Sequence, residues 1–561
     1  MKSFVLSAIL STVTCVSVPA SAATLYVDGS VSSSGDGQTW QTALKTIQEG
    51  INKATAGDTV VVAEGTYVEN VQIWKNLVLT STNPLDPAVV EKTVIDGNQA
   101  DSVVKFAGTQ DSSCIVCGFT IRNGKAQEGG GICGAAPTGG TTSAVIRYNV
   151  VSANTAGPSA GSPTCYGGGI AHCQGDIEHN TITENLSAHY GGGLAYCAGT
   201  IRDNLVSMNS ATSGGGGAAV CNGDIVHNQV RQNTSSNGGG GLHDCDGTVR
   251  SNVISGNSAP EGSGGLYSCD VLIAGNVISG NLAERGAGGG MGRCDADILN
   301  NIVVGNSALS GGGLHSCGGT IRRSVIRGNA LIGNAARVSG GGLYGCDGMI
   351  QNNTIARNVA QGGINPFGGG MAFCSGTIAN CIIWDNSAQD DPQVSRCPSP
   401  SYSCIQDWHG AGERNIADDP RFADADGADN DPETGADNDY RLTDESPCLE
   451  AGRNEDWMWD AADLDGNSRI LPGNSAWKVD IGAYEYVASS NQFRDYIRKR
   501  DGGVQLIWTS QEGRTYAVWS CPNLLTDTWT EETTLESQGV ATSWTDLPSS
   551  ASVKFYKLEM R

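Results

Sequence analysis

Nine short segments of the chain repeat the pattern Leu-x-x-Cys or a close variant, and the two variable positions often hold side chains capable of acid–base chemistry. The polar side chains at these positions include Tyr196, His243, Asp244, Tyr267, Arg293, His315 and Tyr344. An imidazole can accept a proton, a phenol can donate one, and a guanidinium can neutralise a carboxylate. Together these groups are what the abstraction of a proton next to a carboxylate requires.

The expected role of each residue follows from its side chain. Arg293 is expected to neutralise charge, and Tyr267 to donate a proton or to stack on a sugar ring. The proton acceptor is expected to be His243 or His315. The other residues of the strip are expected to contact substrate: Asp244, Tyr344 and Tyr196. Asp244 by itself does not supply the carboxylate pair of a glycoside hydrolase, so elimination is favoured over hydrolysis.

Two other interpretations of this strip stay open. From His243 to Tyr344 it spans five consecutive repeats, or about 20 Å at the spacing of paired strands. A strip of that length could bind a polymer without cleaving it. Alternatively, polar side chains on an outward strand face are simply solvated.

The cysteine of this pattern recurs with a period that predicts a solenoid. Cys173, Cys197, Cys221, Cys245 and Cys269 follow at intervals of 24 residues, and Cys294, Cys317, Cys346 and Cys374 continue the series at intervals of 25, 23, 29 and 28 residues. Repeats of this length stack so that each unit buries its apolar face against its neighbours. The nine cysteines are expected to form a buried, mostly unpaired ladder, because two sulfurs per step cannot complete a tetrahedral zinc site. Disulfides are expected instead among Cys397, Cys404 and Cys448.

Asparagines recur in two further columns, which predict tight bends with stacked amides. The first column is Asn149, Asn180, Asn204, Asn228, Asn252, Asn276, Asn301 and Asn353. The second is Asn154, Asn185, Asn209, Asn233, Asn257, Asn281, Asn306, Asn329, Asn358 and Asn386. Three short strands and three bends per repeat predict an all-β fold, a parallel β-helix solenoid that is right-handed by the crossover rule.

The remaining segments predict how the solenoid is closed. Residues 1–22 read as a signal peptide, and residues 23–100 as an N-terminal cap with one helix whose buried face is Leu44, Ile47 and Ile51. The solenoid is expected over residues 101–390, an acidic extension that closes it over 391–488, and a small all-β module over 495–561.

Charge and hydropathy restrict the partners and the location. The net charge of −24 argues against nucleic acid, which needs a basic surface. The predicted signal peptide, with no later apolar stretch long enough for a transmembrane helix, leads us to expect a secreted or cell-surface protein. We also expect a monomer. The acidic run at Asp424, Asp426, Asp429 and Asp431 could bind calcium, or it could be a solvated loop; no other cofactor is expected.

The Ile-x-x-Asn-x-Ile-x-x-Asn repeats resemble the right-handed β-helices of the pectin-lyase-like superfamily. The opening segments Tyr26-Val27-Asp28 and Gly57-Asp58-Thr59-Val60 are similar to the N-terminal cap of secreted bacterial members. The run from Asp419-Pro420-Arg421-Phe422 through Ser446-Pro447-Cys448 to Asp480-Ile481-Gly482-Ala483-Tyr484-Glu485 resembles a choice-of-anchor C-terminal segment.

The resemblance covers residues 23–488 and implies a polysaccharide or cell-surface glycan as partner, with binding and β-eliminative cleavage along the solenoid. The alternative is a non-catalytic adhesin or structural surface protein. The Gly-His-Gly motif of polygalacturonases and the Arg-x-Pro-x-x-Arg signature of pectate lyases are absent from this sequence.

Overall fold

In the computed structural model the chain divides into two compact units, Met1–Ala296 and Asp297–Arg561. The structure describes residues 22–134, 140–158, 164–318, 325–327, 329–427, 438–470 and 478–487, and, further on, 496–500, 503–509, 514–521, 530–536, 541–546 and 555–560. The predicted signal peptide therefore lies almost wholly outside the described residues.

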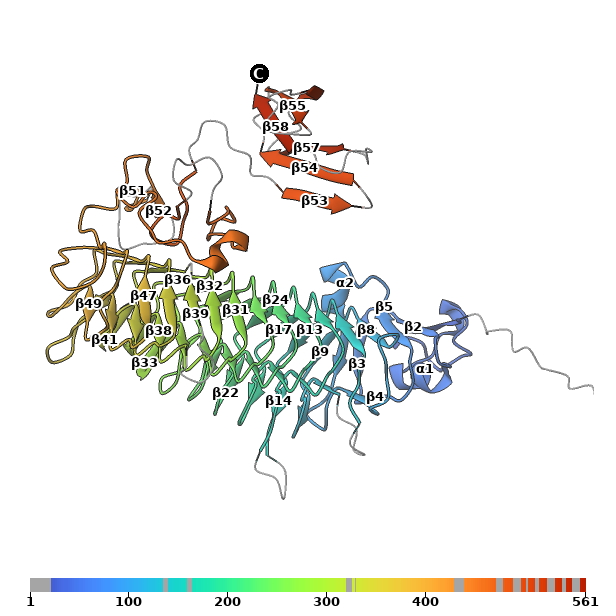
Figure 1. Ribbon diagram of the computed structural model, residues 1–561. Coiled ribbons are helices and arrows are strands. Elements are labelled where there is room, and N and C mark those ends of the chain that lie inside the picture. Colours follow the sequence, from blue (N-terminus) through green and yellow to red (C-terminus); the bar gives the residue numbers. More distant parts are fainter. Residues whose placement is uncertain are drawn as a thin grey trace, which may run out of the picture. The chain divides into compact units, whose positions relative to one another are not determined.

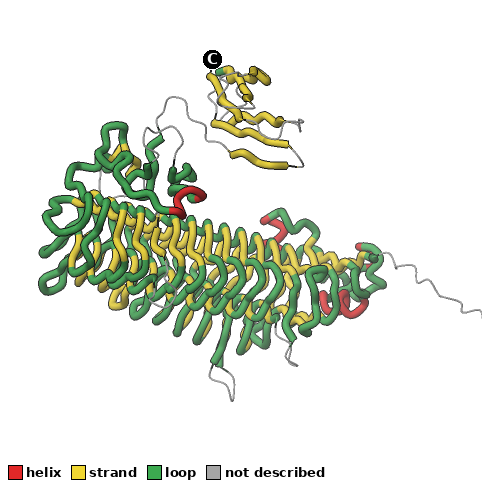
Figure 2. Tube along the Cα trace, viewed as in Figure 1, coloured by secondary structure: helices red, strands yellow, loops and turns green. Residues whose placement is uncertain are grey.

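Parallel strands form three long sheets and one short sheet in the described part of unit 1 (Figure 1, Figure 2). The first sheet consists of β1 (Thr24–Val27), β2 (Thr59–Val62), β5 (Val78–Ser81), β8 (Ile115–Cys117), β12 (Val145–Arg147), β16 (Ile177–Glu178), β20 (Ile201–Arg202), β24 (Ile225–Val226), β28 (Val249–Arg250) and β31 (Leu272–Ala274). The second consists of β3 (Gly65–Val68), β6 (Thr93–Asp96), β9 (Thr120–Arg122), β13 (Val150–Ser152), β17 (Thr181–Thr183), β21 (Leu205–Ser207), β25 (Gln229–Arg231), β29 (Val253–Ser255) and β32 (Val277–Ser279).

The third sheet carries the Leu-x-x-Cys pattern. It consists of β4 (Val71–Ile73), β7 (Val104–Phe106), β11 (Ile132–Cys133), β15 (Ile170–Ala171), β19 (Leu194–Ala195), β23 (Ala218–Ala219), β27 (Leu242–His243), β30 (Leu266–Tyr267) and β34 (Met291–Gly292). Leu194 pairs with Ala218, and Ala218 with Leu242, so one coil advances the chain by one repeat. The predicted parallel β-helix is confirmed.

A short fourth sheet was not expected from the sequence. It consists of five two-residue strands: β10 (Lys125–Ala126), β14 (Thr155–Ala156), β18 (Leu186–Ser187), β22 (Ser210–Ala211) and β26 (Thr234–Ser235). The longer β33 (Leu282–Ala287) comes later in the chain and is not part of this sheet. The five short strands lie where a variable loop was predicted. They form because the bend at the second asparagine column is identical in successive coils, which holds the next two residues in register.

The N-terminal cap contains a shorter helix than predicted. After η1 (Trp40–Thr42), the helix α1 (Ile47–Lys53) begins at Ile47, because Thr46 and Glu49 form a reciprocal capping box there. Ile47 and Ile51 are fully buried, as expected, and α1 packs against β1, β2 and β4. Leu44 instead lies before the helix and forms an isolated bridge with Val27. A second helix, α2 (Pro87–Lys92), precedes β6.

Each bend is made by the residue before the column residue, not by the column residue itself. In one coil the left-handed residues are Tyr196, Asp203 and Met208, with φ of 53°, 57° and 54°. They directly precede Cys197, Asn204 and Asn209. The left-handed residue before the cysteine explains why two residues an odd number apart, Leu194 and Cys197, are both buried. The prediction that the asparagines themselves adopt this conformation is wrong.

The asparagines instead connect the coils through their side chains. The Nδ2 of Asn204 donates to the Oδ1 of Asn228 at 3.0 Å, and its Oδ1 accepts from the Nδ2 of Asn180 at 3.0 Å. The predicted amide stacking is confirmed, with one correction. Asn329 belongs to the first column, since it bonds Asn353, and Asn334 takes its expected place in the second.

The cysteine ladder is buried, and its members are free thiols. Each ladder sulfhydryl donates to the carbonyl two residues earlier, as Cys245 does to His243 at 3.5 Å. Cys397 makes the same bond to Ser395 at 3.2 Å and accepts from the Cys374 amide, so it belongs to the ladder and not to a disulfide set. Burial raises the pKa of Cys346 well above its usual value, which keeps this thiol protonated.

We expect thiol-specific reagents to label few ladder cysteines in the native protein and most of them once the protein is denatured without reductant. The reason is that buried thiols are inaccessible to reagents in the native protein. Counting labelled cysteines by mass spectrometry before and after denaturation measures this. Near-zero labelling in the denatured, unreduced protein would mean that the ladder is oxidised.

Unit 2 contains the same kind of coil. Its first sheet has β35 (Asp297–Leu299), β39 (Val325–Arg327), β43 (Met349–Gln351) and β47 (Thr377–Ala379), and its second has β36 (Ile302–Val304), β40 (Ala330–Ile332), β44 (Thr354–Ala356), β48 (Ile382–Trp384) and β50 (Cys404–Ile405). The third has β38 (Leu314–His315), β42 (Leu343–Tyr344), β46 (Met371–Ala372) and β49 (Val394–Ser395), and the short one has β37 (Ser307–Ser310), β41 (Ala335–Ser339) and β45 (Val359–Ala360).

An acidic extension folds back onto these coils. It contains the antiparallel pair β51 (Phe422–Asp424) and β52 (Asp439–Leu442), and the turn of helix η2 (Asp456–Asp460). The Nδ2 of Asn380 donates to the carbonyl of Arg453 at 2.9 Å, and the Gln351 side chain bonds Glu455. Cys404 and Cys448 lie in one buried cluster, and a hydrogen bond between them raises the pKa of Cys404. Both are free thiols, so the disulfides expected among Cys397, Cys404 and Cys448 are absent from the structure.

The final strands form two antiparallel sheets of three strands. One contains β53 (Tyr496–Arg500), β54 (Gly503–Thr509) and β57 (Ala541–Asp546), and the other β56 (Thr530–Glu536), β55 (Thr515–Cys521) and β58 (Phe555–Met560). Leu506, Tyr516 and Val518 form a small core with Leu535 and Trp544. The described strands of this segment are thus all β, and the bounds 495–561 of the module stay a prediction.

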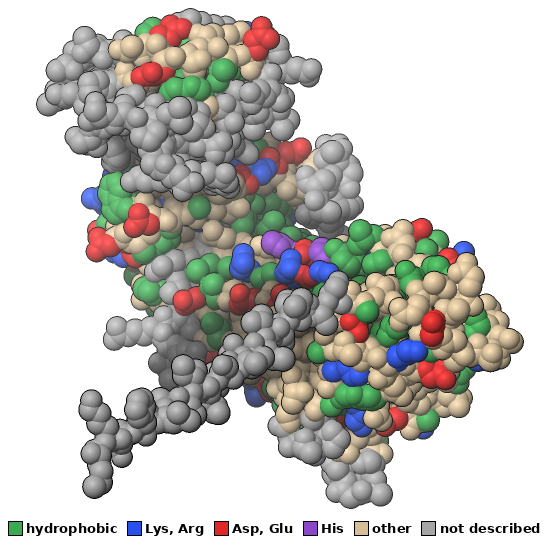
Figure 3. Space-filling model, turned by 90° about the vertical axis from the view of Figure 1, so that its right-hand side faces the viewer, with side chains coloured by type: hydrophobic (Ala, Val, Ile, Leu, Met, Phe, Trp, Pro, Cys, Tyr) green, Lys and Arg blue, Asp and Glu red, His purple; other side chains and the backbone are tan. Residues whose placement is uncertain are grey.

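On the face that Figure 3 presents, acidic and basic side chains are interspersed among the described residues. None of the helices in the described ranges has the length and hydropathy needed to cross a membrane.

Candidate functional site

The first variable position of Leu-x-x-Cys, immediately after the leucine, lies on the third sheet and is more enclosed than the sequence suggested. Ala195 and Ala219 have no exposed surface there, and His243 is only 8% exposed. The His243 ring lies against the backbone at Gly214 and Gly238, where an added Cβ would come within 2.7 Å and 2.6 Å of ring atoms. Glycine at these two positions makes the space that the imidazole occupies.

His243 belongs to a stack of rings in unit 1, hereafter the first stack: Tyr190, His243, Tyr267 and Arg293. Its ring centroid lies 5.7 Å from that of Tyr190 and 5.5 Å from that of Tyr267. The Arg293 guanidinium lies over the Tyr267 ring, 5.7 Å from its centroid. The predicted residues His243, Tyr267 and Arg293 are therefore brought together, in the order in which their coils stack.

A second group of rings adjoins the first stack. Tyr196 meets Tyr166 edge to face at 4.8 Å and stacks on His172 at 5.2 Å, and Tyr166 stacks on Tyr190 at 6.3 Å. Burial, followed by the neighbouring phenol of Tyr166, raises the pKa of Tyr196 to about 12. Its hydroxyl therefore stays protonated at neutral pH and can donate a hydrogen bond.

Carboxylates face the two histidines of unit 1 that belong to these groups. The Nε2 of His243 lies 3.4 Å from an Asp244 oxygen, and the Nε2 of His172 lies 3.3 Å from a Glu128 oxygen. The buried Nδ1 of His243 has no hydrogen-bond partner among the described residues. Asp244 was expected to contact substrate; in the structure its carboxylate faces the imidazole of His243 in the first stack.

Unit 2 contains a comparable arrangement, hereafter the second stack: His315, Tyr344, Phe373, Phe367 and Arg396. His315 and Tyr344 stack at 5.0 Å, and Tyr344 meets Phe373 edge to face at 5.5 Å. Arg396 covers Phe367 at 4.3 Å and Phe373 at 5.1 Å.

Arg293 and Arg396 occupy the same place in their coils. Each directly precedes a ladder cysteine and has a left-handed backbone, with φ of 51° and 54°. Both residues are exposed, and neither forms an ion pair with a carboxylate of the described residues. Each stack therefore ends in a solvent-facing guanidinium that lies over an aromatic ring.

The geometry limits the chemistry of the predicted residues. The Tyr267 ring stacks on His243 and also lies under the Arg293 guanidinium, so its hydroxyl is better placed than its ring to contact a ligand. His243 is sandwiched and nearly buried, which makes it a poor proton acceptor for a substrate. His315 is half-buried, and its ring stacks on the phenol ring of Tyr344.

Of the predicted calcium ligands, the structure describes only Asp424 and Asp426. The Asp426 carboxylate pairs with Arg357 at 2.6 Å, and no cluster of three or more potential metal ligands occurs in the described ranges. Asp429 and Asp431 lie outside the described residues. A calcium site there stays a prediction, and it would have to compete with Arg357 for Asp426.

Sequence reasoning missed Tyr190, Tyr166, Phe367 and Arg396. Tyr166 and Tyr190 each precede a glycine run, and they bridge each other in adjacent coils. Their position one residue before a glycine run was the sequence signal that could have identified these two tyrosines. Arg396 was missed because Cys397 was assigned to a disulfide set, which removed Ser395-Arg396-Cys397 from the repeat.

Comparison of the sequence with protein-family models and with curated proteins finds no match. Among solved structures, the chain is similar to one described as "Crystal structure of pectate lyase Pel9A", with a TM-score of 0.29 and 14% identity over 82% of this chain and 96% of that chain. It is also similar to "The complex structure of XylC with xylose", with a TM-score of 0.30 and 10% identity over 72% of this chain and 88% of that chain. At these TM-scores the likeness carries no inference, and the parallel β-helix assignment rests on the strand pairing itself.

Proposed function

We propose that this protein binds an acidic, uronate-containing polysaccharide through the arginine-terminated stacks, outside the cytoplasm. The observation that carries the proposal is the pair of exposed guanidinium groups, Arg293 and Arg396, each held against aromatic rings at the same place in a coil. A guanidinium fixed in this way keeps its donors free for a carboxylate and loses little side-chain entropy on binding.

Charge and hydrogen bonding support the same ligand class. The chain carries a net charge of −24, so an acidic ligand needs a local positive group, which Arg293 and Arg396 would supply. A bound uronate would offer one carboxylate to the guanidinium and hydroxyls to the phenol groups of the half-buried Tyr267 and Tyr196. Because proton abstraction needs an accessible base and His243 is enclosed, binding is proposed as the principal activity.

Substituting the two arginines tests the proposal. We expect Arg293→Ala and Arg396→Ala each to weaken binding of polygalacturonate or alginate at least about tenfold, since a charge-assisted hydrogen bond contributes about 1.5–3 kcal/mol. Affinity electrophoresis and isothermal titration calorimetry measure the loss. Arg293→Lys should restore only part of the affinity, because lysine keeps the charge but not the planar stack.

Arg285→Ala is the matched control, because Arg285 is exposed in unit 1 but already paired with Glu261 at 2.7 Å. The ultraviolet absorbance of unsaturated products, followed in the same mixtures, reports any β-eliminative cleavage. Failure of the unsubstituted protein to bind any acidic polysaccharide would support the alternative, a non-catalytic adhesin or structural protein. Unchanged affinity in both alanine variants would place the binding surface elsewhere.

A further inference from the structure

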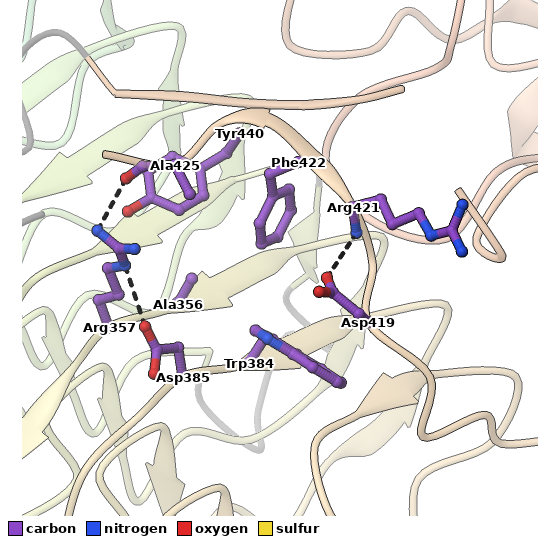
Figure 4. A pocket seen from close by; sticks show the side chains of 9 residues that line it. All are labelled: Ala356, Arg357, Trp384, Asp385, Asp419, Arg421, Phe422, Ala425 and Tyr440. Carbon is purple, nitrogen blue, oxygen red and sulfur yellow. Dashed lines mark hydrogen bonds and ion pairs between the residues drawn. The ribbon is translucent and has the colours of Figure 1, made fainter. Parts of the chain in front are cut away.

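Unit 2 contains a cavity of about 240 Å³ between the coils and the acidic extension (Figure 4). Its lining residues come from both sides: Ala356, Arg357, Trp384 and Asp385 from the coils, and Asp419, Arg421, Phe422, Ala425 and Tyr440 from the extension. The cavity is separate from both stacks, since it shares no residue with them. Its size suits one sugar ring or a molecule of similar size.

Three aromatic side chains form the apolar walls of this cavity. Trp384 lies on the coil side at the end of β48 and is half-buried. Phe422 and Tyr440 lie on the extension, with ring centroids 5.1 Å apart and ring planes 75° from each other. Walls of this kind pack well against the C–H faces of a pyranose ring, which are apolar although the ring edge is polar.

The two arginines of the cavity are already occupied. Arg357 donates to Asp385 at 3.1 Å, to the carbonyl of Ala425 at 2.8 Å and to Asp426 at 2.6 Å. The Arg421 side chain points away from the other lining residues in Figure 4 and pairs with Glu445 at 2.6 Å. Neither guanidinium is therefore available to neutralise a bound anion.

The carboxylates of the cavity keep free acceptor capacity. Asp385 and Asp419 each use one oxygen in a hydrogen bond: Asp385 accepts from Arg357, and Asp419 accepts from the backbone N–H of Arg421. Their remaining lone pairs can accept hydrogen bonds from vicinal hydroxyls. With two guanidinium groups against the four carboxylates of Asp385, Asp419, Asp426 and Glu445, the surroundings are net negative and disfavour a uronate.

We propose that this cavity binds a single neutral sugar residue, stacked on Trp384 and Phe422 and hydrogen-bonded to Asp385 and Asp419. The site is distinct from the stacks and selects against the acidic sugars that those stacks are proposed to bind. It would thus give unit 2 a second, chemically different recognition site.

Titration of the full-length protein with small probes tests this inference. The probes are neutral monosaccharides (glucose, galactose, mannose, xylose and rhamnose), galacturonate, and tetramethylammonium, followed by saturation-transfer NMR and calorimetry. We expect saturable binding of at least one neutral sugar and at least about tenfold weaker binding in Trp384→Ala, because a buried aromatic anchor dominates such sites. Trp459→Ala is the matched control, since Trp459 is 55% exposed in the same extension and does not line the cavity.

A milder substitution guards against loss of folding. Asp419→Asn keeps the shape and the backbone bond to Arg421 but removes a charge, so it should weaken neutral-sugar binding and reduce the discrimination against galacturonate. Binding of tetramethylammonium alone would identify an organic-cation cage instead and overturn the proposal. So would neutral-sugar binding that survives both Trp384→Ala and Asp419→Asn. These results are independent of the Arg293 and Arg396 variants, so the two proposals can fail separately.

Discussion

Replacing Asn204 by alanine should lower the free energy of unfolding of its part of unit 1 by more than about 3 kcal/mol. The side chain is 2% exposed and connects three coils. It accepts from the backbone N–H of Asn180 at 2.9 Å, and its Nδ2 donates to the carbonyls of Ile177 at 2.7 Å and Arg202 at 2.9 Å and to Asn228 at 3.0 Å. Alanine would leave several of these buried groups unsatisfied, at about 1–3 kcal/mol each.

Hydrogen–deuterium exchange of the flanking coils is the suitable measurement, because a solenoid need not unfold in a single step. Asn222→Ala is the control, since Asn222 is exposed and its side chain makes one long bond, to the Asp246 amide at 3.4 Å. It should change the stability by less than about 0.5 kcal/mol. A loss below about 1 kcal/mol in Asn204→Ala would show that water or relaxation replaces the ladder bonds.

Replacing Arg469 by methionine should destabilise the acidic extension by about 3–5 kcal/mol at neutral pH. Arg469 and Glu485 have side chains only 1% and 2% exposed, and they pair at 3.1 Å. Arg469 also donates to the carbonyls of Gly482 and Ala483, both at 3.0 Å. Methionine has a similar length but would leave the Glu485 carboxylate buried without a counter-charge.

The effect of Arg469→Met should depend on pH. Burial already raises the pKa of Glu485 well above its usual value, and loss of Arg469 would raise it further. A carboxyl whose folded-state pKa is raised contributes stability below its unfolded pKa and loses it as the pH rises through the folded pKa. The destabilisation should therefore be smaller at about pH 5 than at about pH 7.

Amide exchange of residues 438–470 and 478–487 at the two pH values measures this dependence. The double variant Arg469→Met/Glu485→Gln should recover much of the loss, since it removes the buried charge. Arg453→Met is the control, because the Arg453 side chain is 44% exposed where it pairs with Glu455 and such pairs contribute about 0–1 kcal/mol. Equal destabilisation at both pH values would contradict the proposed role of Glu485.

The 24-residue period was enough to predict the coil, the amide columns and the buried thiols. In a solenoid each repeat meets only its neighbours, so identical local bends at Tyr196, Asp203 and Met208 produce identical pairing in the next coil. The same logic shows why Asn329 was misassigned. The spacing changes at that coil, and only the bond from Asn329 to Asn353 reveals the register.

Side-chain surroundings that depend on several coils, or on the returning extension, could not be inferred from the chain. The enclosure of His243 requires Gly238 from its own coil together with Gly214 and Tyr190, which lie in earlier coils and become neighbours only when the coils stack. The pairing of Asp426 with Arg357, 69 positions away, likewise placed an expected metal ligand in an ion pair with a residue of the coils. A periodic sequence specifies its backbone through short-range bends, whereas burial and ion pairing are set by which side chains meet from distant coils.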